Sequence, residues 1–473
     1  MTVAREVGAR ETAAAPRSLA LAALIALILL KLALLLAIGP LTSPDTGGYA
    51  AIADAMRHGG YWGRLDLHAA NSALLTARAP GYPALLALAH RVAGTSGAWL
   101  LALLQIALGV AAAVALHGFA RALLGNAVAA LLVTAAYATS LPLVLDQTLL
   151  TDGPYASLMV IFLAHLGRCA IQRTRVPSRT ILLLGLLPAA GLLLRESTTQ
   201  VMVTVLPLIA CFLYAVRPGV LPRLAVFILL LLPLAAVNAG VSAFNAVRSG
   251  ASFLSTGLRT ALLVPLVQME ARGAPVFQAD DPVVRALRQE IKEWRNAVIY
   301  DAVTRTEQRL GITPVEMAKD VRGFFLRSIA AYPGVYASVV LTELRPRYFA
   351  LSVAPAASLG TLIASRGGTL VSVSQSIPKG GAGRLLTLGV YGATALVAGL
   401  CWLAMVPGLP LLALARARRG FALDIAVLLA LAAFHVGLLL FYAMVHIEAR
   451  YLIPAEFVPP LALAYLLLAW RRP

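Results

Sequence analysis

Long apolar runs, separated by short arginine-bearing segments, dominate the pattern of this chain. Each run approaches the ~20 residues that an α-helix needs to cross the hydrocarbon core of a bilayer. The runs lie near 19–39, 98–119, 126–145, 155–171, 180–194, 200–216, 223–243, 385–406, 422–443 and 453–470. The pattern therefore predicts an all-α polytopic membrane protein with about ten transmembrane helices.

Composition and charge support this class and orient the chain. Hydrophobic residues make up 60% of the 473 positions and charged residues 13%, which excludes a soluble domain of this size. The net charge of +18 comes mainly from arginines in short loops, namely Arg121, Arg168, Arg173, Arg175, Arg179, Arg217, Arg223, Arg416, Arg418, Arg419, Arg471 and Arg472. All of them fall on the side of the N-terminus, so the positive-inside rule predicts two cytoplasmic termini in a plasma membrane of the bacterial inner-membrane type. Membrane lipids, rather than nucleic acid, are the expected partners of this charge.

The polar segments divide what is otherwise one membrane domain over residues 1–473. Residues 40–97 are expected to form the first outer, periplasmic loop, with interfacial helices. Residues 244–384 are expected to form an outer cap, in which 281–311 reads as one amphipathic helix and 357–384 as a mobile piece rich in glycine and serine. Residues 385–473 complete the chain as a three-helix part.

Two aspartates stand at the outer ends of predicted spans. Asp45 follows the first span and Asp152 precedes the fourth, with Asp146 as a competitor six residues earlier. Each of the first two also sits where a helix cap would be, so a purely structural role is the alternative. Two carboxylates on one membrane face suit glycosyl transfer, in which one takes the proton of the acceptor hydroxyl and another orients a sugar.

Basic residues expected at the same face suggest an anion-binding site. Arg78 heads a Pro-Gly-Tyr-Pro corner, and its guanidinium could bind a lipid phosphate or anchor the chain at the interface. Lys31, inside the first span, either extends to the interface or faces the site. His446 and Arg450 are four residues apart, so a helical turn would place them on one face with Glu448 pointing elsewhere; an interfacial belt is the alternative.

Five motifs in this order resemble those of the GT-C glycosyltransferases, membrane enzymes that use polyprenyl-phosphate sugars. The resemblance is nearest to the branch of the protein O-mannosyltransferases and the lipid A aminoarabinose transferase. The motifs are SPDTGGYAAIADAMRHGG, TARAPGYPALLALAHRVAG, LLTDGPYASLMVIFLAHL, GLLLRESTT and EARYLIPAEFVPPL, which cover about the first 200 residues and the last 30. The family usually has Glu at the position of Asp152 and Pro at that of Glu196, whereas 244–384 has no counterpart.

The resemblance implies a role for each candidate residue. It makes Asp45 the base of a single inverting displacement, with Asp152 as a second catalytic carboxylate. It assigns the donor phosphate to Arg78, Arg450 and Arg195. The residues that would line the substrate site are Tyr49, Tyr82, His446, Glu448 and Tyr451.

The resemblance also implies the partners: a polyprenyl-phosphate-sugar donor and a lipid, glycan or protein acceptor. No cofactor is expected with certainty and a divalent cation is left open, because neither Asp-x-Asp nor His-x-x-x-His occurs and the three cysteines have no metal spacing. Two other functions remain to be weighed. One is a transporter or lipid flippase, and the other is an oligosaccharide ligase that uses a diphosphate-linked donor.

Overall fold

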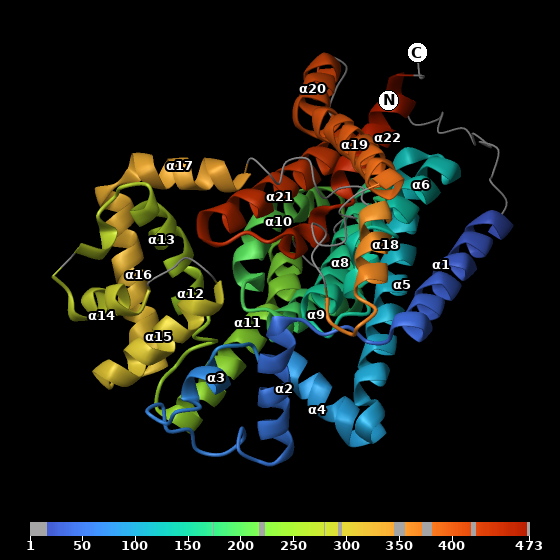
Figure 1. The fold of residues 1–473 in the computed structure, drawn as a ribbon. Helices are drawn as coiled ribbons and strands as arrows, with labels where there is room; N and C mark the ends of the chain where they lie inside the picture. The colour runs from blue at the N-terminus through green and yellow to red at the C-terminus, as the bar shows by residue number, and fades with distance from the viewer. Residues whose placement is uncertain are drawn as a thin grey trace.

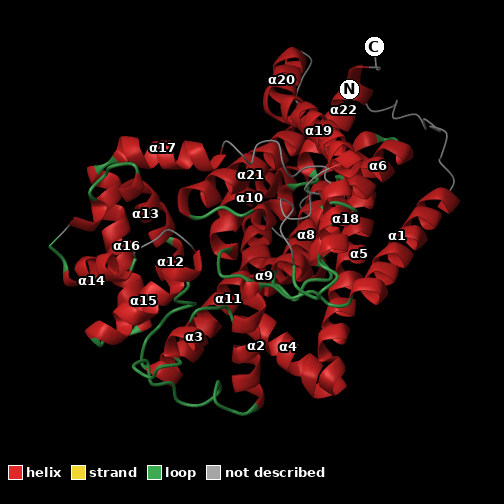
Figure 2. Ribbon diagram, in the orientation of Figure 1, coloured by secondary structure: helices red, strands yellow, loops and turns green. Residues whose placement is uncertain are grey.

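The protein is helical in almost all the residues that its computed structural model describes (Figures 1 and 2). The described residues are 17–173, 175–216, 223–278, 280–291, 296–344, 355–370, 381–417 and 422–470. Within them the extended pairing is limited to two isolated bridges, Leu41 with Thr148 and Thr42 with Thr369. The predicted all-α class is confirmed.

Eight stretches of the described chain are long and apolar enough to cross a membrane. They comprise α1 (Arg17–Ile38), α4 (Gly81–Ala93) with η1 (Gly94–Ser96) and α5 (Gly97–Leu124), α8 (Asp152–Gln172), α10 (Thr198–Ala215), α11 (Arg223–Ser249), α19 (Gly381–Leu403) with η4 (Ala404–Gly408) and α20 (Leu409–Ala417), α21 (Leu423–Val445), and η5 (Ala449–Ala455) with α22 (Val458–Trp470). The two other predicted spans fall on shorter apolar helices, α6 (Ala127–Ala138) and α9 (Ser178–Leu194). All ten predicted runs therefore lie on apolar helices of a multi-pass membrane protein.

The prediction was wrong about where the third span ends. Helix α6 is capped by Asn126, whose side chain accepts a hydrogen bond from the backbone of Ala129, and it stops at Ala138 rather than 145. Ser140 donates its hydroxyl to a carbonyl four residues back, and Pro142 has no N–H to continue the ladder. The chain turns through α7 (Leu141–Leu145) and enters the buried segment 146–151.

The segment 244–384 begins with the last turns of α11 and ends in the first turn of α19, and the described helices between them form two parts. Helices α12 (Leu258–Ala261), α13 (Leu263–Ala271), η2 (Val276–Gln278), α14 (Pro282–Glu290), α15 (Asn296–Leu310), α16 (Pro314–Ala331) and α17 (Pro333–Leu344) pack around a core of their own, at the left of Figure 1. The amphipathic helix expected over 281–311 is a pair, α14 and α15, packed against each other, with 292–295 outside the described residues. Helices α16 and α17 meet at 104°.

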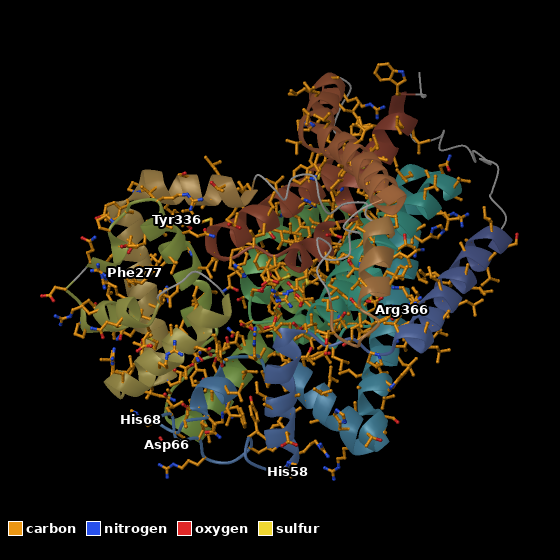
Figure 3. The ribbon with its side chains drawn as sticks, viewed as in Figure 1. His58, Asp66, His68, Phe277, Tyr336 and Arg366 are labelled. Atoms are coloured by element: carbon orange, nitrogen blue, oxygen red, sulfur yellow. The ribbon has the colours of Figure 1, made fainter. Side chains whose placement is uncertain are left out.

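The second part, α18 (Pro355–Ala364), lies against α7 on the other side of the molecule (Figure 1). Beyond it the chain turns at Arg366, labelled in Figure 3, and reaches the segment around Thr42 that leads into α2. The Thr42 amide donates to the Gly368 carbonyl at 2.8 Å, and the Leu370 amide donates to the Thr42 carbonyl at 2.7 Å. The expected mobile piece is thus helical to Ala364 and hydrogen bonded to Thr42 at Gly368 and Leu370, while 371–380 lie outside the described residues.

Residues 40–97, expected as the first outer loop, fold as α2 (Pro44–Arg57) and α3 (Ser72–Thr76) before the Pro-Gly-Tyr-Pro corner opens α4. Its far tip carries His58, Asp66 and His68, which Figure 3 shows at the lower edge of the molecule. The start of α2, by contrast, is docked to the centre. Thr46 donates its hydroxyl to the Leu149 carbonyl at 2.9 Å, beside the start of α8.

Lys31 forms a buried ion pair with Asp146 inside the membrane bundle. The Lys31 Nζ atom lies 2.6 Å from Asp146 Oδ2, and both side chains are 1% exposed. Gly109 of α5 leaves the room for this carboxylate, because a Cβ atom there would be 2.0 Å from Asp146 Oδ2. Lys31 therefore neither extends to the interface nor faces the Asp45 site. Asp146 forms a structural ion pair with it.

We expect Lys31→Met to destabilise the protein by about 3–5 kcal/mol, because it leaves a buried carboxylate without its counter-charge. The double variant Lys31→Met/Asp146→Asn should recover most of this loss, since no charge then remains to be buried. Thermal unfolding in one detergent measures both effects. Equal stability of Lys31→Met and the wild type would contradict the pair, as would strictly additive losses.

Candidate active site

Five separate chain segments place ionisable side chains around the start of α2. They are α2 itself, the corner before α4, the start of α8, the end of α9 and the connection from α21 to α22. Asp45 is not the cap of α2: Ser43 precedes the helix, and its backbone N–H donates to Thr46 Oγ1 at 2.9 Å. Thr151 likewise precedes α8, so Asp152 is its first residue. Neither carboxylate is therefore used as a cap.

Asp45 is held between two guanidinium groups. Arg78 Nη2 donates to Asp45 Oδ1 at 2.7 Å, and Arg450 Nη2 donates to Asp45 Oδ2 at 2.6 Å. Burial by itself would raise the pKa of this carboxyl, but the charges of Arg78 and Arg450 outweigh it and lower the pKa below its usual range. The lowered pKa keeps this carboxylate charged. Its side chain is 27% exposed, so it is accessible as well.

The corner that carries Arg78 is clamped on two sides. The backbone of Gly81 approaches α9 so closely that a Cβ atom would be 2.6 Å from the Leu193 carbonyl oxygen. On the other side, the Thr76 carbonyl accepts a hydrogen bond from the backbone N–H of Thr256, which lies just before α12, at 2.8 Å. The Arg78 guanidinium also lies 5.4 Å from the centre of the Tyr49 ring. These contacts fix Arg78 beside Asp45.

Glu448 organises the connection between α21 and α22. It accepts hydrogen bonds from Arg450 Nε at 2.6 Å, from His446 Nε2 at 3.0 Å and from the Tyr451 hydroxyl at 3.2 Å. The prediction that Glu448 points away from the other two was wrong, because His446 and Glu448 have extended backbones and the helical turn begins at Ala449. Burial would raise the pKa of Glu448, but the hydrogen bond from His446 and the charge of Arg450 lower it.

Asp152 and Arg195 form a second ion pair behind the first. Arg450 Nη1 also lies 3.6 Å from Asp152 Oδ2, so this one guanidinium is paired with three carboxylates. The Arg195 side chain is 14% exposed, and its Cζ lies 3.9 Å from the centre of the Tyr451 ring. In this arrangement Arg195 forms an ion pair with Asp152, whereas Arg78 and Arg450 form ion pairs with Asp45.

The two tyrosines expected to line the site lie at different depths. Tyr49 is 5% exposed and its hydroxyl is 3.3 Å from that of Thr151. Tyr82 is fully buried behind it, with the ring centres 5.1 Å apart, and donates its hydroxyl to Gln105 at 2.8 Å. Tyr82 therefore supports Tyr49 and does not reach the surface of the cluster.

Sequence reasoning missed Tyr442 and Ser197. Tyr442 of α21 lies with its ring centre 5.6 Å from Arg195 Cζ, and its hydroxyl is 3.0 Å from Ser197 Oγ. A single tyrosine within an apolar span, such as Tyr442, cannot be distinguished by sequence from a residue that only packs in the core. Ser197 lies two residues after Arg195, and this closeness in sequence was the available signal.

The charges of the cluster are balanced in the absence of a ligand. Three carboxylates, those of Asp45, Asp152 and Glu448, face three guanidinium groups, those of Arg78, Arg195 and Arg450. An incoming anion would therefore compete with these carboxylates for the arginines. Among the described residues no group of three or more His, Cys, Asp or Glu side chains is arranged to hold a metal ion.

Comparison with known proteins found only solved structures. No protein-family model and no curated protein sequence matches the chain. The structure is similar to ArnT from Cupriavidus metallidurans bound to undecaprenyl phosphate, with 15% identity and a TM-score of 0.36 over 94% of this chain and 78% of that one. Its apo state gives 15% identity and a TM-score of 0.37 over 93% and 77%.

At this identity and these TM-scores, the likeness carries no argument about the family of this chain. No residue role is taken from it either.

Proposed function

We propose that this protein is a GT-C-type membrane glycosyltransferase, which transfers a sugar from a polyprenyl-phosphate-linked donor to an acceptor hydroxyl on the outer face of the membrane. The observation that carries the proposal is Asp45, a charged and accessible carboxylate held by two arginines from distant segments. The resemblance of five motifs to this class supports it. A lipid, a glycan or a protein would supply the hydroxyl.

The two arginines would change partners when the donor binds. A phosphate is a bidentate acceptor for guanidinium groups and competes with Asp45 for Arg78 and Arg450. Once these positive charges pair with the phosphate, the pKa of Asp45 rises from its lowered value, because the charges that lower it are shared. Donor binding would thus turn a weak base into a competent one.

The chemical step would be one inverting displacement. The acceptor oxygen attacks the anomeric carbon as the bond from that carbon to the phosphate oxygen breaks, and polyprenyl phosphate departs. Asp45 accepts the proton of the acceptor hydroxyl. Arg78 and Arg450 stabilise the charge that develops on the departing phosphate. Asp152, fixed by Arg195, would orient Arg450 and a sugar hydroxyl, and His446 and Glu448 would line the sugar site.

The direct test incubates the purified protein with radiolabelled polyprenyl-phosphate sugars and a membrane lipid extract. We expect label to move to an acceptor in the extract, and no movement when Asp45→Asn replaces the wild type. A parallel reaction with diphosphate-linked donors separates this proposal from an oligosaccharide ligase. Transfer from diphosphate donors alone would overturn the donor class.

One observation favours transport as a second candidate. Glu456 in the last span is 1% exposed, and both its carboxylate oxygens are buried with no hydrogen-bond partner among the described residues. Ionisable groups inside a membrane commonly mark proton or substrate pathways. Proteoliposomes loaded with labelled lipid-linked sugar decide between the two: translocation that survives Asp45→Asn would support a transporter.

Arg78→Ala should act on the donor and on the pH profile together. We expect a higher KM for the donor and a smaller effect on acceptor use, because the lost contact is to the phosphate. Removing Arg78 also removes the largest cause that lowers the pKa of Asp45, so the acid limb of kcat/KM should move to higher pH.

Arg78→Lys is the matched control for this change. It keeps the charge and loses only the bidentate fork, so it should restore the pH profile and part of the KM. If Arg78→Ala alters protein yield alone, with KM and the pH profile unchanged, then Arg78 is an interfacial anchor.

A further inference from the structure

A groove of about 340 Å³ runs between α5 and α8, far from the Asp45 cluster. Ala111, Val114 and Ala115 of α5 form one wall, and Ile161, His165 and Arg168 of α8 form the other. Arg168 follows Asp152 by 16 residues in one helix, which at 1.5 Å per residue is roughly 24 Å. The groove therefore opens near the opposite end of the bundle.

Small residues keep this groove open and hold a cation at its end. Ala111, Ala115 and Gly118 follow each other on one face of α5, at helical spacing. A Cβ atom on Gly118 would be 3.2 Å from Arg168 Nη1, so the guanidinium lies against the bare backbone of α5. Arg168 Nε is 3.3 Å from Gln172 Oε1, which orients the group further.

The charge at this end has no acidic partner among the described residues. The polar contact found for Arg168 is the neutral Gln172, and the Arg168 side chain is exposed. His165 is exposed as well, and its Nδ1 hydrogen bonds to the Ile161 carbonyl at 2.8 Å, which leaves Nε2 available. Ala111 and Val114 of α5 are exposed too, and they line the same groove as His165 and Arg168 of α8.

We propose that this groove binds an anionic phospholipid of the bilayer. One acyl chain would lie along Ala111, Val114 and Ile161, and the headgroup phosphate would be bound by Arg168, beside His165. An apolar groove that ends in a cation without an acidic partner matches a ligand with an acyl chain and an anionic headgroup. Basic pockets between membrane helices bind such headgroups. The site does not depend on the proposed sugar transfer.

The test measures binding to the purified full-length protein in detergent. Phosphatidylglycerol and phosphatidylcholine with the same acyl chains are titrated, with native mass spectrometry for occupancy and thermal unfolding for stabilisation. We expect phosphatidylglycerol to bind preferentially. Arg168→Gln should weaken it about fivefold, as one basic residue near a membrane surface contributes about 1 kcal/mol.

Three variants separate a built site from general attraction. Ala111→Leu fills the groove without changing any charge and should reduce occupancy as Arg168→Gln does. Arg168→Lys should retain most of the binding. Arg223→Gln removes another exposed arginine, at the start of α11, and should leave binding unchanged.

Any of three results would overturn the proposal: equal binding of phosphatidylcholine, equal loss in Arg223→Gln, or full binding in Ala111→Leu. Inorganic phosphate at the same concentration should neither stabilise the protein nor displace the lipid. If it does both, the site binds free anions and the apolar groove plays no part. Unfolding without lipid identifies any variant that is merely misfolded, and Ala111→Leu still tests the groove if Arg168→Gln is lost.

Discussion

Replacing Asp45 by asparagine is expected to reduce sugar transfer by about two orders of magnitude or more, within the range attributed to general base catalysis. An amide has nearly the shape of the carboxylate but cannot accept the hydroxyl proton. The loss should appear in kcat, because the arginines that bind the phosphate are still present. Initial rates at saturating donor, measured with the radiolabelled transfer assay, give this number.

The structure adds an expectation about stability that helix capping alone would not suggest. Asp45 is no cap and pairs with Arg78 and Arg450, so Asp45→Asn leaves Arg78 without its carboxylate partner, while Arg450 keeps Glu448 and Asp152. The melting temperature of Asp45→Asn should therefore fall modestly. Asp54→Asn is the matched control, because Asp54 lies on the same helix and is 63% exposed. Full activity of Asp45→Asn, with the control also active, would end the proposed role.

Arg450→Ala is expected to have the largest effect of any single arginine substitution. Arg450 is paired with Asp45 at 2.6 Å, with Glu448 at 2.6 Å and with Asp152 at 3.6 Å, so its removal leaves three clustered carboxylates facing one another. Both donor binding and melting temperature should fall. Arg78→Ala, which deprives one carboxylate of one partner, should lower the melting temperature less.

A double-mutant cycle on donor affinity tests whether Arg78 and Arg450 bind the same phosphate. The variant that lacks both should lose less affinity than the sum of the single losses, because each arginine depends on the other for its position. Arg223→Ala serves as the remote control and should be additive with either. Strict additivity of Arg78 and Arg450 would separate them, and Arg450 would then be assigned to Asp45 and Glu448 alone.

The order of spans and the set of candidate residues could be predicted from the sequence because both depend on local patterns. Apolar runs of membrane length predict helices whatever their neighbours are, and polar residues at the ends of these runs must lie near one membrane face or the other. That reasoning identified Asp45, Arg78, Asp152 and Arg450 before any geometry was known. The break after α6 escaped it, because 126–145 is apolar almost throughout and only Ser140 and Pro142 mark the turn.

Only the tertiary structure decided which of these charges meet. Arg450 and Asp45 are 405 residues apart, and Lys31 and Asp146 are 115 apart, so no local pattern relates either pair. Lys31 was ambiguous in sequence because its burial depends on the room that Gly109 leaves in another helix. Glu448 was misplaced because an assumed helical turn is extended, held by hydrogen bonds to His446 and Arg450. Membrane length and polarity determine where a helix lies along the bilayer normal, whereas the partners of a side chain follow from how helices pack and rotate against one another.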